Sequence, residues 1–311
     1  MTDALSFPSN CSRRTFLRQT AAAGAGLALG TLATAPARAA KPEELYRISC
    51  TEYSLHRMIQ KKELDNLEYA AFVRKTFGLD GVEYWNRPFF TKAEDEKYIA
   101  EMRKRADDAG VNGTVILIDG EGNLGDADEK KRIEAVDRHK KWVVAARKLG
   151  CHSIRVNARS TGTYEEQQKL SADGLRRLSE FGKDHECGII VENHGGYSSN
   201  GKWLAGVMEM VDLPNCGTLP DFGNFRDYDR YLGVKELMPY AKSVSAKSHE
   251  FNEEGEEVHT DFLKMMKIVV DAGYHDYVGI EFEGGKVSEV EGVKATQRLL
   301  ERVREKLAAA S

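Results

Sequence analysis

Four side chains of the types that bind divalent metals stand at the ends of short runs that predict buried strands. Glu192 closes the apolar run Gly188–Val191, and Asp221, His249 and Glu281 close three later runs. A carboxylate at the end of a buried strand is costly unless it meets a cation or a hydrogen-bond partner. The four residues together therefore predict a single polar site.

This residue set predicts a site for one divalent metal ion. Three carboxylates and one imidazole favour Mn²⁺, Mg²⁺ or Co²⁺, with Zn²⁺ as a further candidate, and would leave room for two substrate oxygens. Each residue alone also has a structural explanation: Glu192 in a salt bridge at the rim, Asp221 as cap of the turn 222–224, His249 packed at a strand end, Glu281 paired with Lys247. The recurrence of the pattern on four neighbouring strands favours the shared site.

A second set of side chains is predicted to face the same site, because residues two apart on a strand point the same way. The predicted substrate-binding residues of this kind are His194, Lys247, Arg155, Asn157, Glu83 and Trp85. Glu83 and Trp85 also fit simple packing at the rim. Arg155 also fits an ion pair with Glu83 or Glu192. The set predicts a polar, partly aromatic cup for a hydroxylated ligand.

Strands and amphipathic helices alternate from Tyr46 to the end of the chain, at a spacing of roughly thirty residues. The predicted strands are Tyr46–Ser54, Gly81–Trp85, Thr114–Asp119, Ser153–Asn157, Gly188–Glu192, Thr218–Asp221, Ser243–His249 and Val278–Glu283. Thr260 is predicted to cap the helix that ends at Ala272. Eight such units predict a single α/β domain, a (β/α)₈ TIM barrel over residues 40–311, with its active site at the C-terminal strand ends.

An open doubly wound sheet is the main alternative fold. It would be expected to carry a glycine-rich phosphate loop after an early strand. Gly120–Gly125 matches G-x-G-x-x-G in its letters, but the segment is acidic and no helix follows at once. We therefore predict a loop there, and favour the barrel.

Residues 1–39 predict a twin-arginine export signal. Arg13 and Arg14 precede the small, apolar run 21–35, and Ala37–Ala39 supplies an A-x-A cleavage site. The expected location is the periplasm, and the expected partner is the twin-arginine export machinery. The four cysteines after the signal form no C-x-x-C pair and are expected to be buried free thiols.

The charge of the remaining chain argues against nucleic acid as a partner. Without residues 1–39 the chain has 41 basic and 48 acidic residues, and the charges are dispersed. A protein that binds nucleic acid usually carries a basic patch or stripe. The expected partner is a small-molecule carbohydrate.

The chain resembles the xylose isomerase-like TIM-barrel family of sugar phosphate isomerases and epimerases. The resemblance lies in VEN at 191–193, PDFGN at 220–224, AKSH at 246–249 and GIEFEG at 279–284. It implies that Glu192, Asp221, His249 and Glu281 are the metal ligands and that Glu192 and Glu281 are the catalytic acid and base. Asn224 stands where many relatives carry histidine and is included among the substrate-binding residues. The resemblance is also compatible with a homo-oligomer.

These features predict a metal-dependent sugar isomerase or epimerase. One glutamate would remove a proton next to a carbonyl, the metal would stabilise the enediolate, and the other glutamate would return the proton. Loss of a leaving group from the same enediolate would make the enzyme a 3-keto-glycoside lyase or hydrolase. A second alternative is an exported sugar-binding protein without catalysis. An endonuclease IV-like phosphodiesterase would need more histidine ligands and a basic face, so we rank it lower.

Overall fold

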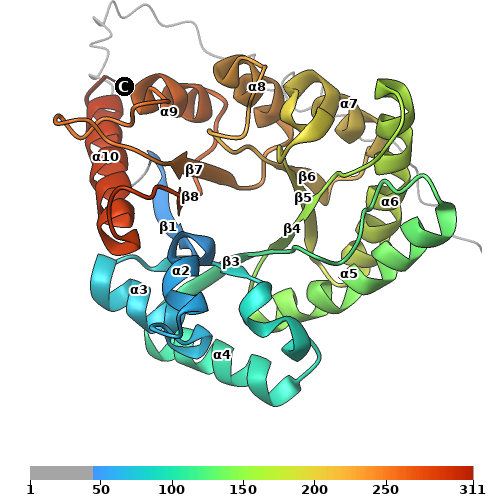
Figure 1. Ribbon diagram of the computed structural model, residues 1–311, viewed down its shortest axis with the longest axis horizontal. Coiled ribbons are helices and arrows are strands. Elements are labelled where there is room, and N and C mark those ends of the chain that lie inside the picture. Colours follow the sequence, from blue (N-terminus) through green and yellow to red (C-terminus); the bar gives the residue numbers. More distant parts are fainter. Residues whose placement is uncertain (1–44, 311) are drawn as a thin grey trace, which may run out of the picture. The chain divides into compact units, whose positions relative to one another are not determined.

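Eight parallel strands form a curled sheet surrounded by helices, as in a TIM barrel (Figure 1). The computed structural model describes residues 45–310, so the predicted export signal lies outside the described residues. The strands are β1 (Arg47–Thr51), β2 (Gly81–Trp85), β3 (Asn112–Leu117), β4 (Ser153–Asn157), β5 (Gly188–Glu192), β6 (Cys216–Leu219), β7 (Val244–Ser248) and β8 (Tyr277–Phe282).

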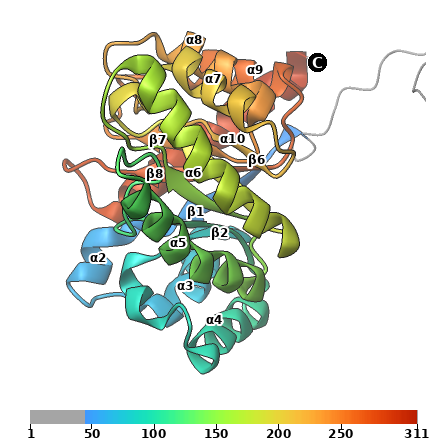
Figure 2. The ribbon, with the colours of Figure 1, turned by 90° about the vertical axis from the view of Figure 1, so that its right-hand side faces the viewer.

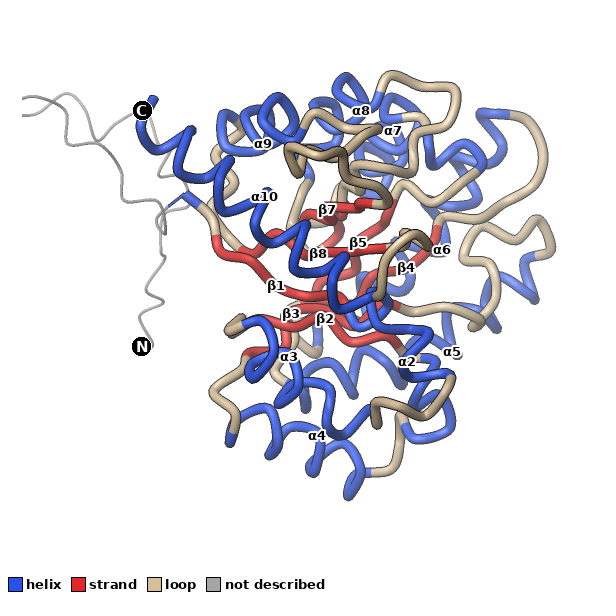
Figure 3. Tube along the Cα trace, turned by 60° about the vertical axis from the view of Figure 1, so that its left-hand side comes forward, coloured by secondary structure: helices blue, strands red, loops and turns tan. Residues whose placement is uncertain are grey.

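Helices follow the strands and cover the outside of the sheet (Figures 2 and 3). They are α2 (His56–Gln60), α3 (Tyr69–Phe77), α4 (Glu96–Asp108), α5 (Glu129–Leu149), α6 (Tyr164–Asp184), α7 (Gly201–Val211), α8 (Arg230–Leu237), α9 (Phe262–Asp271) and α10 (Glu289–Ala310). Within residues 45–310, no helix has the length and apolar character needed to cross a membrane. The alternation of strand and helix is the one that the sequence predicts, and the barrel prediction is confirmed.

The sheet closes between β6 and β7, close to the predicted site. The ladder runs in the order β6-β5-β4-β3-β2-β1-β8-β7. Just beyond β6, Asp221 forms an isolated parallel bridge with Ser245 of β7. The Ser245 amide donates to the carbonyl of Pro220 at 2.9 Å, and the Phe222 amide donates to the carbonyl of Ser245 at 3.1 Å. This closure holds Asp221 directly beside Ser245.

Two apolar regions hold the barrel together. The larger one packs the outward-facing strand residues against the helices, and it contains the four free, buried cysteines that the sequence predicts. A smaller cluster fills the barrel interior and consists of Trp85, Val115, Leu117, Ile190 and Leu219. This cluster comes from β2, β3, β5 and β6, whereas a buried polar group of Ser49, Thr51 and Glu83 lies on β1 and β2.

Several predicted element ends differ from the structure. β6 ends at Leu219, β7 at Ser248 and β8 at Phe282, each one or two residues before the predicted end. Thr260 does not cap α9. The cap is Asp261, whose side chain accepts a hydrogen bond from the amide of Lys264. The segment Gly120–Gly125 is a loop, as predicted, and Gly120 and Gly122 have positive φ angles.

Gly174 sits where α6 passes close to the loop after β3. A Cβ atom at this position would overlap the backbone carbonyl of Leu124, which cannot rotate away as a side chain would. Glycine is unfavourable inside a helix, so the close approach explains its presence in the middle of α6.

We expect Gly174→Ala to lower the free energy of unfolding by about 1–3 kcal/mol, because the overlap outweighs the gain in helix propensity. Urea denaturation would measure the change. Glu180→Ala, at an exposed position of the same helix, is the control, and should change stability by less than about 0.5 kcal/mol. A more stable Gly174→Ala variant would contradict the close packing.

Candidate functional site

A polar cavity of about 600 Å³ opens at the C-terminal ends of the strands. It is lined by six of the predicted site residues: Arg155, Asn157, His194, Asn224, Lys247 and Glu281. Glu192 and Asp221 lie behind these residues and are almost fully buried. The position of the cavity agrees with the rule that barrel active sites lie at the C-terminal face.

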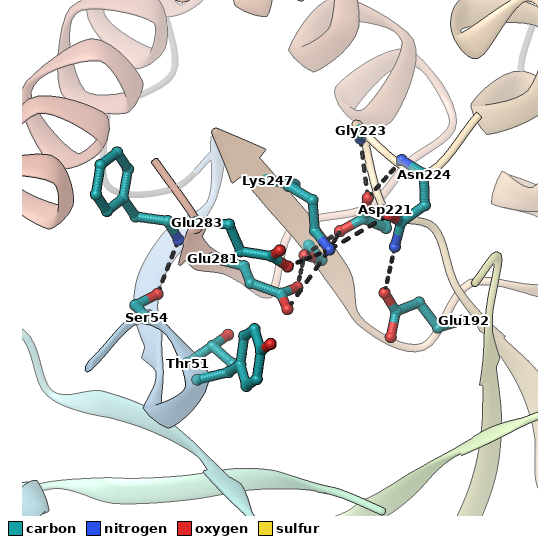
Figure 4. Close-up of polar contacts among 12 residues, drawn as sticks. Thr51, Ser54, Glu192, Asp221, Gly223, Asn224, Lys247, Glu281 and Glu283 are labelled. Atoms are coloured by element: carbon teal, nitrogen blue, oxygen red, sulfur yellow. Dashed lines mark hydrogen bonds and ion pairs between the residues drawn. The ribbon is translucent and has the colours of Figure 1, made fainter. Parts of the chain in front are cut away.

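Three of the four predicted metal ligands come together. One carboxylate oxygen each from Glu192, Asp221 and Glu281 lies within 4.8 Å of the other two, which is close enough to hold a metal ion. We call these three residues the acidic triad. Glu192 lies at the end of β5, Glu281 lies near the end of β8, and Asp221 lies two residues after β6 (Figure 4).

Lys247 reaches into the acidic triad from β7. Its Nζ lies 3.7 Å from Asp221 Oδ2, 3.6 Å from Glu281 Oε1 and 2.7 Å from Glu283 Oε1. The Lys247 side chain is only 4% exposed, and Figure 4 shows its ammonium between these carboxylates. The pairing of Glu281 with Lys247, one of the structural explanations considered from sequence, is therefore present.

Arg155 neutralises the other side of the acidic triad from β4. Its Nε lies 2.8 Å from Glu192 Oε2, and its Nη1 lies 3.1 Å from Asp119 Oδ1. Asp119 also accepts hydrogen bonds from the indole of Trp85 at 3.0 Å and from the amide of Asn157 at 3.1 Å. Of the two ion pairs considered from sequence, Arg155 makes the one with Glu192.

Hydrogen bonds use most of the remaining triad oxygens. Asp221 Oδ1 accepts from the backbone amides of Gly223 and Asn224 at 2.8 and 2.9 Å, which is the turn-capping role considered from sequence. The hydroxyl of Ser245 lies 2.7 Å from Asp221 Oδ2 and 2.8 Å from Glu281 Oε2. Asn224 Nδ2 donates to Glu192 Oε1 at 2.7 Å.

Burial and charge shift the pKa values in the site in different directions. Burial raises the pKa of Glu192 against the effect of Arg155, and it raises the pKa of Asp221 to about 7. For Glu281, burial acts the same way, but the Lys247 and Arg155 charges outweigh it and lower the pKa. Burial disfavours the charge on Lys247, yet the carboxylates beside it raise its pKa well above the usual value. Lys247 and Glu281 are therefore a charged pair at neutral pH.

The predicted divalent ion fits the spacing of the acidic triad but not its charges and hydrogen bonds. A metal ion prefers carboxylate oxygens whose negative charge is not already neutralised. Here Arg155 and Lys247 supply two positive charges, Asp221 Oδ1 already accepts two backbone N–H bonds, and the Ser245 hydroxyl lies beside Asp221 Oδ2. A divalent ion would have to displace the Lys247 ammonium.

Three other predicted residues lie away from the cavity lining. His249 follows the last residue of β7, where the strand alternation no longer applies, and its ring faces His259 at 6.2 Å between centroids. The ligand cluster formed by the acidic triad does not include His249, which was predicted as the fourth ligand. Glu83 is buried on β2 and accepts hydrogen bonds from Ser49 and Thr51. Trp85 packs in the interior cluster rather than at the rim, and its indole N–H donates to Asp119.

Sequence reasoning missed two residues that shape the site, Asp119 and Ser245. Asp119 closes the third predicted strand, so the strand-end rule that selected the four ligands would also have selected it. Ser245 lies two residues before Lys247 and therefore on the same face of β7. Glu283, which the strand alternation places on the same face as Glu281, also lines the cavity.

Three cavity-lining side chains have a buried polar atom without a hydrogen-bond partner among residues 45–310: Arg155 Nε, His194 Nδ1 and Asn157 Oδ1. Arg155 Nε lies 2.8 Å from Glu192 Oε2, so it has an ion-pair partner, whereas His194 Nδ1 and Asn157 Oδ1 have neither. Burial, followed by the charges of Arg155 and Lys247, lowers the pKa of His194 to about 4, so its ring is neutral at physiological pH. Unpaired buried polar atoms are costly, and the hydroxyls of a bound ligand would satisfy them.

We expect Arg155→Met to lower the free energy of unfolding by about 3–5 kcal/mol, because it removes the buried guanidinium that pairs with both Asp119 and Glu192. Chemical denaturation at neutral pH would measure the change. Arg159→Met is the matched control, because Arg159 lines the same cavity but is exposed. Equal stability of the two variants would contradict the role given to Arg155.

Solved structures with the same fold include sugar epimerases and metal-bound proteins. The chain is similar to the IOLI protein with a bound zinc atom (TM-score 0.67, 15% identity, 84% of this chain and 98% of that one). It is similar to 3-keto-D-glucoside 4-epimerase YcjR from E. coli, with a TM-score of 0.63 and 15% identity over 76% of this chain and 94% of that one. A third similar structure is a xylose isomerase-like TIM barrel protein from Mycobacterium smegmatis in complex with magnesium, with a TM-score of 0.63 and 14% identity over 86% of this chain and 98% of that one. A search of curated protein sequences finds no significant match.

A family model also matches most of the barrel. It covers residues 71–305, from α3 into α10, and it therefore includes every candidate site residue named above. The match agrees with the eight-stranded topology and with the likeness to the solved structures. The chain belongs to the xylose isomerase-like TIM barrel family.

Proposed function

We propose that the protein is a carbohydrate isomerase or epimerase that moves a proton on a carbon next to a carbonyl group. The observation that carries the proposal is the charged pair of Glu281 and Lys247, 3.6 Å apart, at the wall of a polar cavity. A carboxylate and a cation side by side can remove a proton and stabilise the negative charge that develops on the carbonyl oxygen. Sugar epimerases among the similar structures support the substrate class.

In the proposed reaction, Glu281 takes the proton and an enediolate forms. The Lys247 ammonium, which lines the same cavity, would stabilise the enediolate oxygen. Two residues are proposed as the second proton-transfer group: His194, which lines the cavity, and Glu192, which lies behind the lining with one oxygen within 4.8 Å of a Glu281 oxygen. Return of the proton to the opposite face gives epimerisation, and return to the adjacent carbon gives isomerisation.

The unpaired atoms of the cavity would bind the hydroxyl groups of the sugar. His194 Nδ1 and Asn157 Oδ1 lie in the lining and have no partner of their own within the described chain. His194 is neutral, so its ring can donate or accept a hydrogen bond according to its tautomer. These contacts would orient the substrate carbon towards Glu281.

We also propose that the enzyme meets its substrate after export. The twin-arginine segment directs the protein to the periplasm in this proposal, where glycosides and free sugars are accessible. A 3-keto-glycoside is one such substrate, and similarity to a 3-keto-D-glucoside 4-epimerase favours this class. On a 3-keto-glycoside, loss of the glycosidic leaving group from the enediolate would be a lyase reaction, so the product decides between the two activities.

We expect the wild-type protein to incorporate solvent deuterium at a carbon next to the carbonyl of its substrate, and Glu281→Gln to abolish this exchange, because the amide cannot accept the proton. NMR of a panel of ketoses, aldoses and 3-keto-glycosides in D₂O would measure the exchange. The labelled product identifies the enzyme as isomerase, epimerase or lyase.

The control for this experiment is Glu253→Gln, which removes an exposed carboxylate outside the cavity lining and should exchange as the wild type does. Glu192→Gln and His194→Asn, tested separately, identify the second proton-transfer group. Exchange by Glu281→Gln at the wild-type rate would contradict the proposed role of Glu281.

A further inference from the structure

The acidic triad contains a cation that belongs to the chain itself. Lys247 Nζ is within 4 Å of three carboxylates, two of them members of the acidic triad. Its side chain is 4% exposed, so this ammonium is held inside the site rather than in solvent. A buried ammonium is stable only when carboxylates and hydrogen bonds compensate for its lost hydration.

The arrangement around Lys247 fixes it in place. β7 and β8 are in register with Lys247 opposite Glu281, so the two side chains start from neighbouring backbone positions. Glu283 and the Oδ1 of Asn224 accept from the ammonium at 2.7 and 3.4 Å on the cavity side. The Cδ and Cγ atoms of Lys247 lie 3.0 Å from the place a Cβ would occupy at Gly223, so glycine leaves room for the lysine stem.

Access to the remaining triad oxygens is also restricted. Glu192 is held by Arg155 on one oxygen and by Asn224 on the other. Arg155, Asn224 and Lys247 line the cavity, whereas Glu192 and Asp221 do not. An ion that enters from the cavity therefore meets two positive side chains before it meets those carboxylates.

We propose that the Lys247 ammonium takes the place of the divalent ion expected for this family, and that the protein binds no divalent metal in the acidic triad. The site then works with a fixed positive charge that cannot be lost to chelators. The position of the ammonium is independent of the proposed function, whereas its action on an enediolate rests on that function.

Metal binding by the full chain tests this proposal directly. The protein would be produced in medium supplemented with Mn²⁺, Co²⁺ and Zn²⁺, and its metal content and melting temperature would be measured with excess Mn²⁺ or with EDTA. We expect only trace metal and the same melting temperature in both solutions. Stoichiometric metal retained by the wild type, or a melting temperature that falls in EDTA, would overturn the proposal.

Substitution of Lys247 provides the second arm of the test. Lys247→Met leaves the carboxylates without their ammonium, so this variant should bind one divalent ion per chain and melt several degrees higher in excess Mn²⁺ than in EDTA. Lys247→Arg keeps the charge and should bind none. Lys267→Met removes an exposed lysine of α9 and should behave as the wild type. A folded Lys247→Met variant that gains no metal binding would contradict the proposal, and the wild-type measurements decide it if that variant fails to fold.

The proposed action of Lys247 on the enediolate is tested by measuring deuterium exchange into the substrate by the wild type, once in the presence of EDTA and once in the presence of Mn²⁺. Equal exchange in both supports the proposal, and exchange that requires added metal overturns it. No exchange with any sugar would refute the proposed function instead, and the metal measurements would still decide the place of the ammonium.

Discussion

The site depends on the compensation of buried negative charge. Glu192, Asp221 and Glu281 are buried within a few ångströms of each other, which is unfavourable unless positive charge is buried with them. Arg155 on β4 and Lys247 on β7 supply that charge from opposite sides of the acidic triad. Both cations are themselves buried, so each depends on the carboxylates as much as the carboxylates depend on it.

The barrel topology explains why these charges meet. The strands run in parallel, so residues at their C-terminal ends approach one another around the closed sheet. The join between β6 and β7 places Asp221 beside Ser245, whose hydroxyl reaches both Asp221 and Glu281. The closure of the sheet between β6 and β7 therefore positions Ser245 to contact two carboxylates of the acidic triad.

The fold could be predicted from sequence because it depends on the alternation of apolar strands and amphipathic helices, which is visible along the chain. Glu192 and Glu281 could be placed because each follows an apolar run, Glu192 as the last residue of β5 and Glu281 as the residue before the last of β8. His249 could not, because β7 ends one residue before it, so the strand alternation does not fix its direction; its backbone amide donates to Glu257. The role of Ser245 depends on a contact across the β6–β7 join, and no pattern within one strand indicates it.

The sequence also could not decide whether Glu281 pairs with Lys247 or binds a metal ion. Lys247 and Glu281 were compatible with an ion pair, and Glu281 was equally compatible with a metal ligand. Which of these applies depends on distances of a few ångströms between side chains from different strands. The structure places the ammonium within reach of Asp221, Glu281 and Glu283 together, a geometry that residue spacing alone does not determine.

The most direct test of this account is a crystal structure of the protein grown with excess Mn²⁺, with anomalous diffraction data collected to locate the ion. The account predicts no anomalous peak among Glu192, Asp221 and Glu281, and it predicts the Lys247 ammonium bound to Glu283 beside them. A strong peak within coordination distance of these three carboxylates, with the Lys247 side chain turned away, would contradict it.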